Sequence, residues 1–432
     1  MNYKEIYNQK LLDIEGVLSK IESGDSLVVG MAAAEPVGLL SNLHLIKDSV
    51  QDVTVVSCLL LMEYEYYKHV DKEHSPFRSE TWYLGNYERA LFKEGKATYI
   101  PNNLHMAATD LMQARRVNIY CGSATPMDNK GCMSLALGNV YEKDILEHAD
   151  MVILEINENL PRTHGDTVVH INDVDFLYEY NAPLIEVPSA EASEVEKKIG
   201  EFIADLIENG STIQLGIGGI PNAIAQFLTD KKELGVHTEL MTEGIVDLIE
   251  AGVITNSQKS LWKDKCIASF VMGTQRLYDF VDNNLAVEIH RGRIVNDPYI
   301  VAKNKKMVSI NTALSVDLTG QVCSEAFGHQ QYTGTGGQLD MHRGAIMSEG
   351  GKAIIAMRSS VKNDTISTIV PTLPQGSFVT IPRHDVDYII TEYGVAHLRG
   401  KSLRERTLEM IRTAHPNFRD YLKTEAEKLG FI

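Results

Sequence analysis

A glycine-rich stretch and one carboxylate are the parts of this sequence best suited to chemistry. Residues 216–221 read Gly-Ile-Gly-Gly-Ile-Pro and overlap a run, Thr212–Ile217, whose composition predicts a strand. A turn of this kind, between a strand and a helix, leaves backbone N–H groups free to bind an anion or a developing oxyanion. Because Pro221 stands where a GxGxxG fingerprint needs its last glycine, a dinucleotide site is excluded. A tight turn without a ligand explains the glycines equally well.

Glu239, in the segment Val-His-Thr-Glu-Leu, is the carboxylate. Its apolar neighbours Val236 and Leu240 favour a poorly solvated carboxylate, which is more nucleophilic than one in water. Taken alone, an acidic residue is more often a solvated surface group, and Glu243 competes with Glu239 for a catalytic role.

A second loop region, Gly320–Lys352, is dense in glycine, threonine and serine. Loops of this composition expose backbone donors, and glycine pairs beside predicted strands indicate close approach to a ligand. An ordinary surface loop is the alternative interpretation.

The signals of several other catalytic classes are missing from the sequence. No HExxH or CxxC spacing supports a metal site, and no GxSxG elbow supports a serine nucleophile. The five cysteines are scattered, so no disulfide framework is expected.

Short β-like runs alternate with helical stretches and must position these residues. The alternation predicts mainly parallel sheets with helices on both faces. In the first half the β-like runs are Ser26–Gly30, Val53–Leu61, Ala97–Ile100, Val117–Cys121 and Met151–Ile156, and the helical stretches include Val37–Ile46, Glu88–Phe92 and Tyr141–His148. In the second half a helix capped by Ser193 precedes the runs Thr212–Ile217, Ile267–Met272, Met307–Leu314, Ala353–Met357 and Tyr388–Thr391. A helix is also expected over Asn222–Leu228, after the glycine turn.

Part of the glycine stretch occurs twice. Four residues of the first half match four of the second at the same spacing: Ile21, Glu22, Gly24 and Gly30 match Ile207, Glu208, Gly210 and Gly216. The spacing predicts two copies of one α/β unit, with Gly24 equivalent to Gly210. The first copy has alanines at 32–34 where the second has glycines, which makes close backbone approach to a ligand harder. The second copy is therefore the better candidate site.

We place a domain boundary at about residue 188, where Pro183 and Pro188 interrupt the pattern. The prediction is two tandem, internally related open α/β domains with mainly parallel sheets, residues 1–188 and 189–432. At 432 residues the chain is too long for one ordinary core, in agreement with two domains. One aromatic group is expected to pack a domain or subunit interface, namely Tyr64, Tyr66, Tyr67, Trp82 and Tyr83.

Composition narrows the class of protein and its partners. A hydrophobic content of 44% with 23% charged residues is typical of a globular protein. The net charge of −17 argues against nucleic acids and anionic membranes as partners. The N-terminal residues contain no apolar signal region, which predicts a cytoplasmic protein. We expect an even-numbered homo-oligomer, such as a homodimer.

The motifs together resemble those of class I coenzyme A transferases, in the acetyl-CoA hydrolase/transferase branch. Gly216–Pro221 looks like the GxGGxP motif of that family. The supporting segments, spread over nearly the whole chain, are Ser123–Asp128, Asn159–Arg162, His237–Glu239, Gly320–Glu325, Gly334–Asp340 and Thr391–Gly394. Each segment is weak alone, whereas the ordered set is specific.

The resemblance implies a role for particular residues. Glu239 matches the family's catalytic glutamate, which becomes a glutamyl-CoA thioester. The residues that match the loop for CoA and the oxyanion are Gly216, Ile217, Gly218, Gly219 and Ile220. Those near other CoA-contacting positions are Leu314, Gly337 and Lys362. The sequence departs from the family at Ser123-Ala124-Thr125, where Ser-Pro is usual, and at Leu160, where methionine is frequent; both departures bear on the acid pocket.

The implied reaction is ping-pong transfer of CoA from a short-chain acyl-CoA, such as acetyl-CoA or butyryl-CoA, to a carboxylic acid such as 4-hydroxybutyrate. Acyl-CoA and small carboxylic acids are then the partners. Coenzyme A is a substrate, and neither a metal nor a bound cofactor is expected. One alternative is an acetyl-CoA hydrolase, in which water reaches the same glutamyl intermediate. Another is an α/β protein without CoA chemistry that binds sugar phosphates through its glycine turns.

Overall fold

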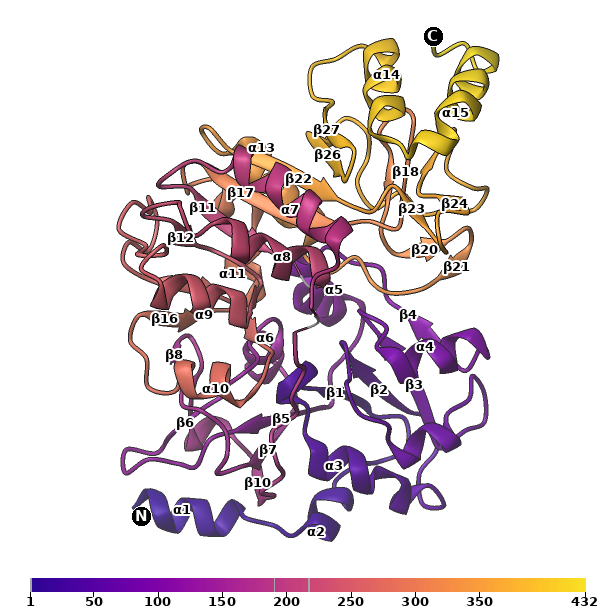
Figure 1. Cartoon of the computed structure of the whole chain (residues 1–432). Helices are drawn as coiled ribbons and strands as arrows, with labels where there is room; N and C mark the ends of the chain where they lie inside the picture. The colour runs from indigo at the N-terminus through magenta and orange to yellow at the C-terminus, as the bar shows by residue number, and fades with distance from the viewer. Residues whose placement is uncertain (1, 190, 217) are drawn as a thin grey trace. The chain divides into compact units, whose positions relative to one another are not determined.

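The computed structural model describes residues 2–189, 191–216 and 218–432, and for Asn222 the backbone alone. The chain forms two compact units. Unit 1 comprises Met1–Val187 with Ile267–Ile294, and unit 2 comprises Pro188–Cys266 with Val295–Ile432. Figure 1 follows the chain through both, from indigo at the N-terminus to yellow at the C-terminus.

Unit 1 contains a seven-stranded sheet in the order β10-β7-β5-β1-β2-β3-β4, and every neighbouring pair is parallel. Its strands are β1 (Ser26–Val29), β2 (Val53–Ser57), β3 (Phe77–Thr81), β4 (Ala97–Tyr99), β5 (Ile119–Ala124), β7 (Met151–Ile156) and β10 (Phe176–Glu179). The inner strands β1 and β5 are buried at every position, because helices cover a parallel sheet on both faces.

The other elements of unit 1 are helices and short strands. The helices are α1 (Tyr3–Lys10), α2 (Ile14–Leu18), α3 (Val37–Asn42), α4 (Asn86–Lys93), α5 (Ala107–Ala114), α6 (Glu142–Leu146) and α10 (Gln275–Val281). The short strands are β6 (Cys132–Ser134), β8 (His164–Gly165), β9 (Val168–His170), β14 (Cys266–Ala268), β15 (Phe270–Val271) and β16 (Val287–Ile289). Helix α11 (Gly292–Val295) spans the point where the chain passes from unit 1 to unit 2.

Unit 2 contains a six-stranded sheet in the order β12-β11-β17-β22-β26-β27, parallel except for the last pair. Its strands are β11 (Thr212–Leu215), β12 (Gly235–Val236), β17 (Met307–Thr312), β22 (Lys352–Ala356), β26 (Tyr388–Thr391) and β27 (Gly394–His397). The helices are α7 (Glu194–Leu206), α8 (Gly219–Phe227), α9 (Glu243–Glu250), α12 (Pro298–Val301), α13 (Gln338–Met347), α14 (Leu403–Thr413) and α15 (Pro416–Lys428). The short strands are β13 (Leu240–Met241), β18 (Ser315–Asp317), β19 (Val322–Cys323), β20 (Ala326–Phe327), β21 (Gln330–Gln331), β23 (Ser360–Val361), β24 (Ile366–Ser367) and β25 (Ile369–Val370).

The two sheets repeat one topology, as predicted. Read in chain order, β2-β1-β5-β7-β10 and β12-β11-β17-β22-β26 are both 2-1-3-4-5. Gly24 and Gly210 have φ of +84° and +75°, and their N–H groups donate to carbonyls just before β2 and β12, respectively. Gly30 and Gly216 likewise donate to the equivalent strands β5 and β17. The predicted pair of related, open, mainly parallel α/β folds is therefore confirmed.

Some element bounds differ from the predicted ones. Helix α8 begins at Gly219 rather than at Asn222, because Gly218 takes a φ of +117° and lets the chain turn early. Pro221 then falls in the first helical turn, where its missing N–H is not needed. The run Val53–Leu61 pairs only as far as Ser57.

The compact units do not follow a single cut near residue 188. Residues 267–294, placed in the second domain by the sequence, pack within unit 1. Strand β16 pairs in parallel with β8. Arg291 forms ion pairs with Asp144, Glu147 and Asp166, which hold the same segment to that unit.

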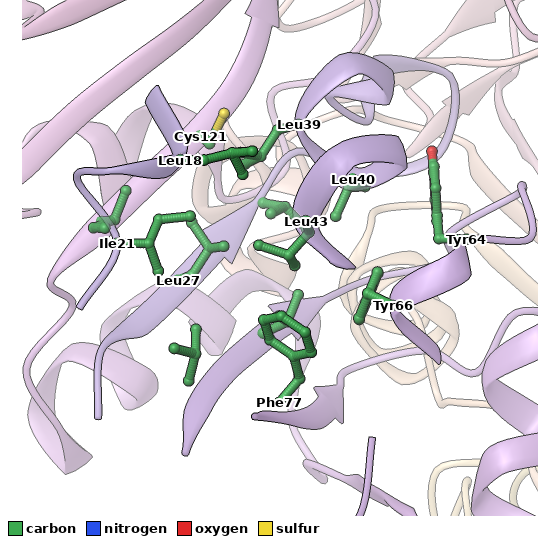
Figure 2. Close-up of a cluster of buried hydrophobic side chains, with 14 of the residues drawn as sticks. Leu18, Ile21, Leu27, Leu39, Leu40, Leu43, Tyr64, Tyr66, Phe77 and Cys121 are labelled. Atoms are coloured by element: carbon green, nitrogen blue, oxygen red, sulfur yellow. The ribbon is translucent and has the colours of Figure 1, made fainter. Parts of the chain in front are cut away.

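The aromatic residues assigned to an interface lie inside unit 1 instead. Tyr64, Tyr66 and Tyr67 belong to one buried cluster with the leucines and valines of β1, β2 and α3. Figure 2 shows Tyr66 beside Phe77, and the ring centroids are 5.8 Å apart. Trp82 is also buried, against Tyr141 at 4.6 Å. The interface prediction is wrong for these residues, because a seven-stranded sheet needs large side chains to fill the space under its helices.

Across the described residues, none of the helices has both the length and the apolar character that a bilayer crossing requires.

The Arg291 network should account for much of the stability of residues 267–294. The side chains of Arg291 and Asp144 are only 9% and 6% exposed, so Arg291→Met leaves a buried carboxylate poorly compensated. We expect the free energy of unfolding to fall by about 3–5 kcal/mol. Arg293 also pairs with Asp144 but is 52% exposed, so Arg293→Met should cost less than about 1 kcal/mol. Urea unfolding of both variants tests the difference; equal losses would contradict it.

Candidate active site

The glycine turn and Glu239 lie at the same edge of the sheet in unit 2. Strands β11 and β12 are parallel neighbours, with Thr212 opposite Gly235 and Ile213 opposite Val236. Both strands therefore end at one edge, where β11 leads into the glycine turn and β12 leads into Glu239. Ligands of open α/β sheets bind at this carboxyl edge.

The segment that carries Glu239 is fastened at each residue. The carbonyl of Val236 accepts from the buried Lys259 Nζ at 2.7 Å. His237 Nε2 bonds the carbonyl of Val295 at 2.7 Å, and Thr238 Oγ1 donates to a carbonyl two residues further on at 3.0 Å. These contacts give a role to the histidine and the threonine that precede the carboxylate, both of which are fully buried.

Neutral donors surround the carboxylate of Glu239. Asn296 Nδ2 donates to Oε2 at 2.8 Å, and the backbone of Gly337 also donates to the carboxylate. The pKa of Glu239 is raised to about 7, chiefly by burial and also by the nearby Asp340, while the hydrogen bonds from Asn296 and Gly337 act in the opposite direction. Near neutral pH both the neutral and the ionised form of the carboxyl group are therefore populated, and shifted pKa values of this kind are common at functional sites.

Gly337 is a glycine because of Glu239. A Cβ atom on Gly337 would lie 1.9 Å from Glu239 Oε2 and 2.0 Å from Asn296 Nδ2. Its φ of −87° is open to any residue, so space and not backbone conformation excludes a side chain. Gly337 is the N-cap of α13, and Gln338 Nε2 fastens this helix start to the carbonyl of Thr312 at 2.6 Å. The second glycine-rich loop thus lies against the carboxylate of Glu239, and its predicted close approach to a ligand stays a prediction.

The glycine turn is only partly available to a ligand. The N–H of Gly216 is already used by the carbonyl of Ile310 at 2.9 Å. Gly218 is exposed, and a Cβ there would have nothing within 4 Å, so space is open beside the turn. Ile220 is buried, and Ile217 lies outside the described residues. The donors suited to an anion are therefore those at the start of α8, which has no side-chain cap.

The remaining predicted residues lie in different settings. Leu314 is half-buried between β17 and β18, after the carboxyl end of a central strand. Lys362 is exposed at the tip of the β23–β24 hairpin with a φ of +52°. No hydrogen bond or ion pair joins Lys362 to Glu239 within the part of the chain that the structure describes.

Two models of one protein family match most of the chain. The model of the acetyl-CoA hydrolase/transferase N-terminal domain matches residues 1–187, and that of the C-terminal domain matches residues 273–426. The chain belongs to the acetyl-CoA hydrolase/transferase family. The predicted resemblance is confirmed, and the protein is an enzyme of the CoA-transferase type.

Individual members of the family align over the full length. The 4-hydroxybutyrate coenzyme A transferase of Clostridium kluyveri is 42% identical, with 99% of this chain and 100% of the relative covered. The succinyl-CoA:cyclohexane-1-carboxylate CoA transferase of Geobacter metallireducens is 38% identical over 100% of this chain and 98% of its own. The crystal structure of RipA from Yersinia pestis has a TM-score of 0.93 at 36% identity, with both chains covered completely.

The sequence motifs did not identify two residues that contact this site, Asn296 and Lys259. Asn296 is separated from Glu239 by 57 positions, and Lys259 from Val236 by 23. Neither occurs in a motif of regular spacing, and a lysine is rarely fully buried. Their contacts with Glu239 and Val236 appear only when the elements of unit 2 are folded together.

Gly337→Ala should remove most of the CoA-transferase activity of this enzyme. The added methyl group must displace the Glu239 carboxylate, and a misplacement of about 1 Å at a reacting group costs about 100-fold in rate. Gly244→Ala, on α9, is the control, because its Cβ meets only the Cβ of Ala225 at 3.2 Å. Turnover and thermal unfolding of both variants are the measurements. A folded Gly337→Ala enzyme with full activity would contradict this account of the glycine.

The raised pKa of Glu239 predicts a pH-dependent stability. Because the pKa is about 7 in the fold against an ordinary 4.5, the folded protein holds this proton more tightly than the unfolded chain. The stabilisation is present in full at acidic pH and is lost as the pH rises through about 7. Glu239→Gln lacks this titration, so its Tm relative to the parent should rise between pH 5 and pH 8. A constant difference in Tm would mean that the pKa is not raised.

Proposed function

We propose that this enzyme exchanges CoA between an acyl-CoA and a carboxylic acid, with Glu239 carrying CoA as a thioester between the half-reactions. The observation that carries the proposal is a carboxylate held only by neutral donors, Asn296 and Gly337, at the carboxyl edge of the sheet. The open N-terminus of α8 follows the neighbouring strand at that edge.

The proposed chemistry begins with attack of the ionised Glu239 on the thioester carbonyl of acyl-CoA. The C–S bond breaks, CoA leaves as a thiolate, and a mixed anhydride remains. The thiolate then attacks the glutamyl carbonyl carbon of the anhydride, which yields glutamyl-CoA and releases the first acid as its carboxylate. A second carboxylate runs the same steps backwards, so neither water nor a redox agent is consumed and the thioester energy is kept.

Two tetrahedral intermediates must be stabilised in this scheme. The first places an oxyanion on the acyl carbon, and the N–H groups at the start of α8 are suited to receive it. The second places an oxyanion on the glutamyl group itself, where Asn296 and Gly337 already donate to the carboxylate. A preorganised donor of this kind is worth about 3 kcal/mol. Neither step requires a metal or a bound cofactor.

Transfer is favoured over hydrolysis, the other activity in the family's description. Two relatives that align over the full length, at 42% and 38% identity, are named as CoA transferases, whereas two relatives named as acetyl-CoA hydrolases are 26% and 24% identical. We further propose acetyl-CoA or butyryl-CoA as donors and a small monocarboxylic acid, such as 4-hydroxybutyrate, as acceptor. The names of the relatives include both a hydroxy acid and a cyclic acid. Because the chain belongs to the acetyl-CoA hydrolase/transferase family, we do not propose the alternative of a sugar-phosphate-binding protein without CoA chemistry.

Incubation with acyl-CoA and no acceptor acid should leave CoA covalently bound to the protein. Intact-protein mass spectrometry should show a gain of one CoA less one water, and peptide mapping should place it on Glu239. Glu239→Gln should form no adduct and exchange no CoA, because an amide cannot form the anhydride. Glu243→Gln, changed four residues further on in α9, is the matched control and should behave like the parent.

Two outcomes would overturn the assignment: an adduct that persists in Glu239→Gln, or one that maps to Glu243. Rapid release of free CoA from the parent enzyme without an acceptor acid would instead favour the hydrolase.

A further inference from the structure

Glu325 is a buried carboxylate in unit 2 that the proposed chemistry does not use. The residue is 7% exposed. Its Oε1 accepts from Thr380 Oγ1 at 2.9 Å, and its Oε2 accepts from Gln331 Nε2 at 3.0 Å. Thr335 Oγ1 lies 3.3 Å from each of the two oxygens. A carboxylate has enough lone pairs for all three donors at once, which no neutral side chain of its size provides.

The backbone of Glu325 binds the same loop as its side chain. Its carbonyl accepts from the N–H groups of Tyr332 and Thr333 at 2.7 and 3.1 Å. Gln331 Nε2 also donates to the carbonyl of Thr333 at 2.6 Å, which closes the turn. Four donors of residues 331–335 therefore bind Glu325, and Thr380 anchors Glu325 in turn to a distant loop.

The loop held in this way leads directly to the catalytic glutamate. After Thr335 come Gly336, with a φ of +55°, and Gly337, which contacts the Glu239 carboxylate. On the far side of this contact, Gln338 is fastened to β17. Gly337 is thus held on both sides along the chain. Gln338 anchors the helix that follows it, and Glu325 anchors the irregular segment that precedes it.

We infer that Glu325 is a positioning residue, which holds the 331–335 loop so that Gly337 keeps its N–H and its bare Cα against Glu239. The inference rests on the proposed function of Glu239. The contact has little tolerance, because even one added methyl group on Gly337 would overlap the carboxylate oxygen. A loosened loop withdraws one of the two donors to that carboxylate, whereas Asn296, on a different segment, is left in place.

The test compares Glu325→Ala, Glu325→Gln and Thr335→Val with the control Glu409→Ala. Glu409 also ties together charged side chains, Lys401 and Arg412, but it does so on α14, outside the loop. In Glu325→Ala we expect kcat for CoA exchange to fall about 30-fold or more, with a smaller change in KM for acyl-CoA, as for a misplaced reacting group. Glu325→Gln keeps one acceptor oxygen and should recover only part of the loss. Glu409→Ala should lower Tm and leave kcat unchanged.

A second measurement reports on Glu239 without any activity. The pH midpoint of the Tm difference between each variant and its Glu239→Gln counterpart follows the pKa of Glu239. Loss of the Gly337 donor should move that midpoint upward in Glu325→Ala and, by less, in Thr335→Val, while Glu409→Ala keeps the parent value. Should Glu325→Ala fail to fold, Thr335→Val removes a single hydrogen bond of the network and still decides the question.

A Glu325→Ala enzyme, or a Thr335→Val enzyme, that loses Tm with an unchanged midpoint and unchanged kcat would overturn the inference. The proposed function fails differently, since the parent enzyme would then form no adduct on Glu239. The midpoint measurement would remain valid in that case, so the two failures are distinguishable.

Discussion

The carboxylate of Glu239 is held by amide donors and not by a cation, and much of unit 2 is arranged around that constraint. Among the described residues, no lysine or arginine forms an ion pair with it, whereas Asn296 and Gly337 donate to it. A cation would lower the pKa and weaken the carboxylate as a nucleophile. In the proposed reaction, neutral donors can instead serve the same oxygen as carboxylate, anhydride carbonyl and oxyanion. The cost is a buried acid that opposes folding once it ionises.

Meeting this constraint requires three segments from distant parts of the chain. The strand end at Val236 brings Glu239, the start of α12 brings Asn296, and the second glycine loop brings Gly337. Lys259 fastens the first of these segments and Glu325 the third. A parallel sheet suits this task, because all its strands end at one edge and each can deliver a different loop there.

The two copies of the α/β unit differ in what lies at the N-terminus of the helix that follows the first strand. In unit 1, the N–H of Gly38, near the start of α3, donates to the buried Glu155 at 2.6 Å. Burial raises the pKa of Glu155 to about 7, and Tyr178 donates to the same carboxylate at 2.6 Å. In unit 2 the equivalent helix, α8, has no side-chain cap and open space beside Gly218. In unit 1 a protein carboxylate thus accepts a hydrogen bond at the start of this helix, whereas in unit 2 the space beside Gly218 is open and the carboxylate of Glu196 lies near the neighbouring Gly219.

The sequence by itself determined the fold class, the internal repeat, the glycine turn and Glu239, because each depends on local pattern. Alternating strands and helices specify parallel sheets, and the matched Gly24 and Gly210 both take a left-handed conformation. Only the tertiary structure decided which neighbours complete the site. The positions of Asn296 and Lys259 at the site, and the burial of the tyrosines in the core of unit 1, depend on contacts between residues far apart in the chain. No local spacing in the sequence indicates such contacts. The clash at Gly337 likewise exists only once two loops have been brought within hydrogen-bonding distance.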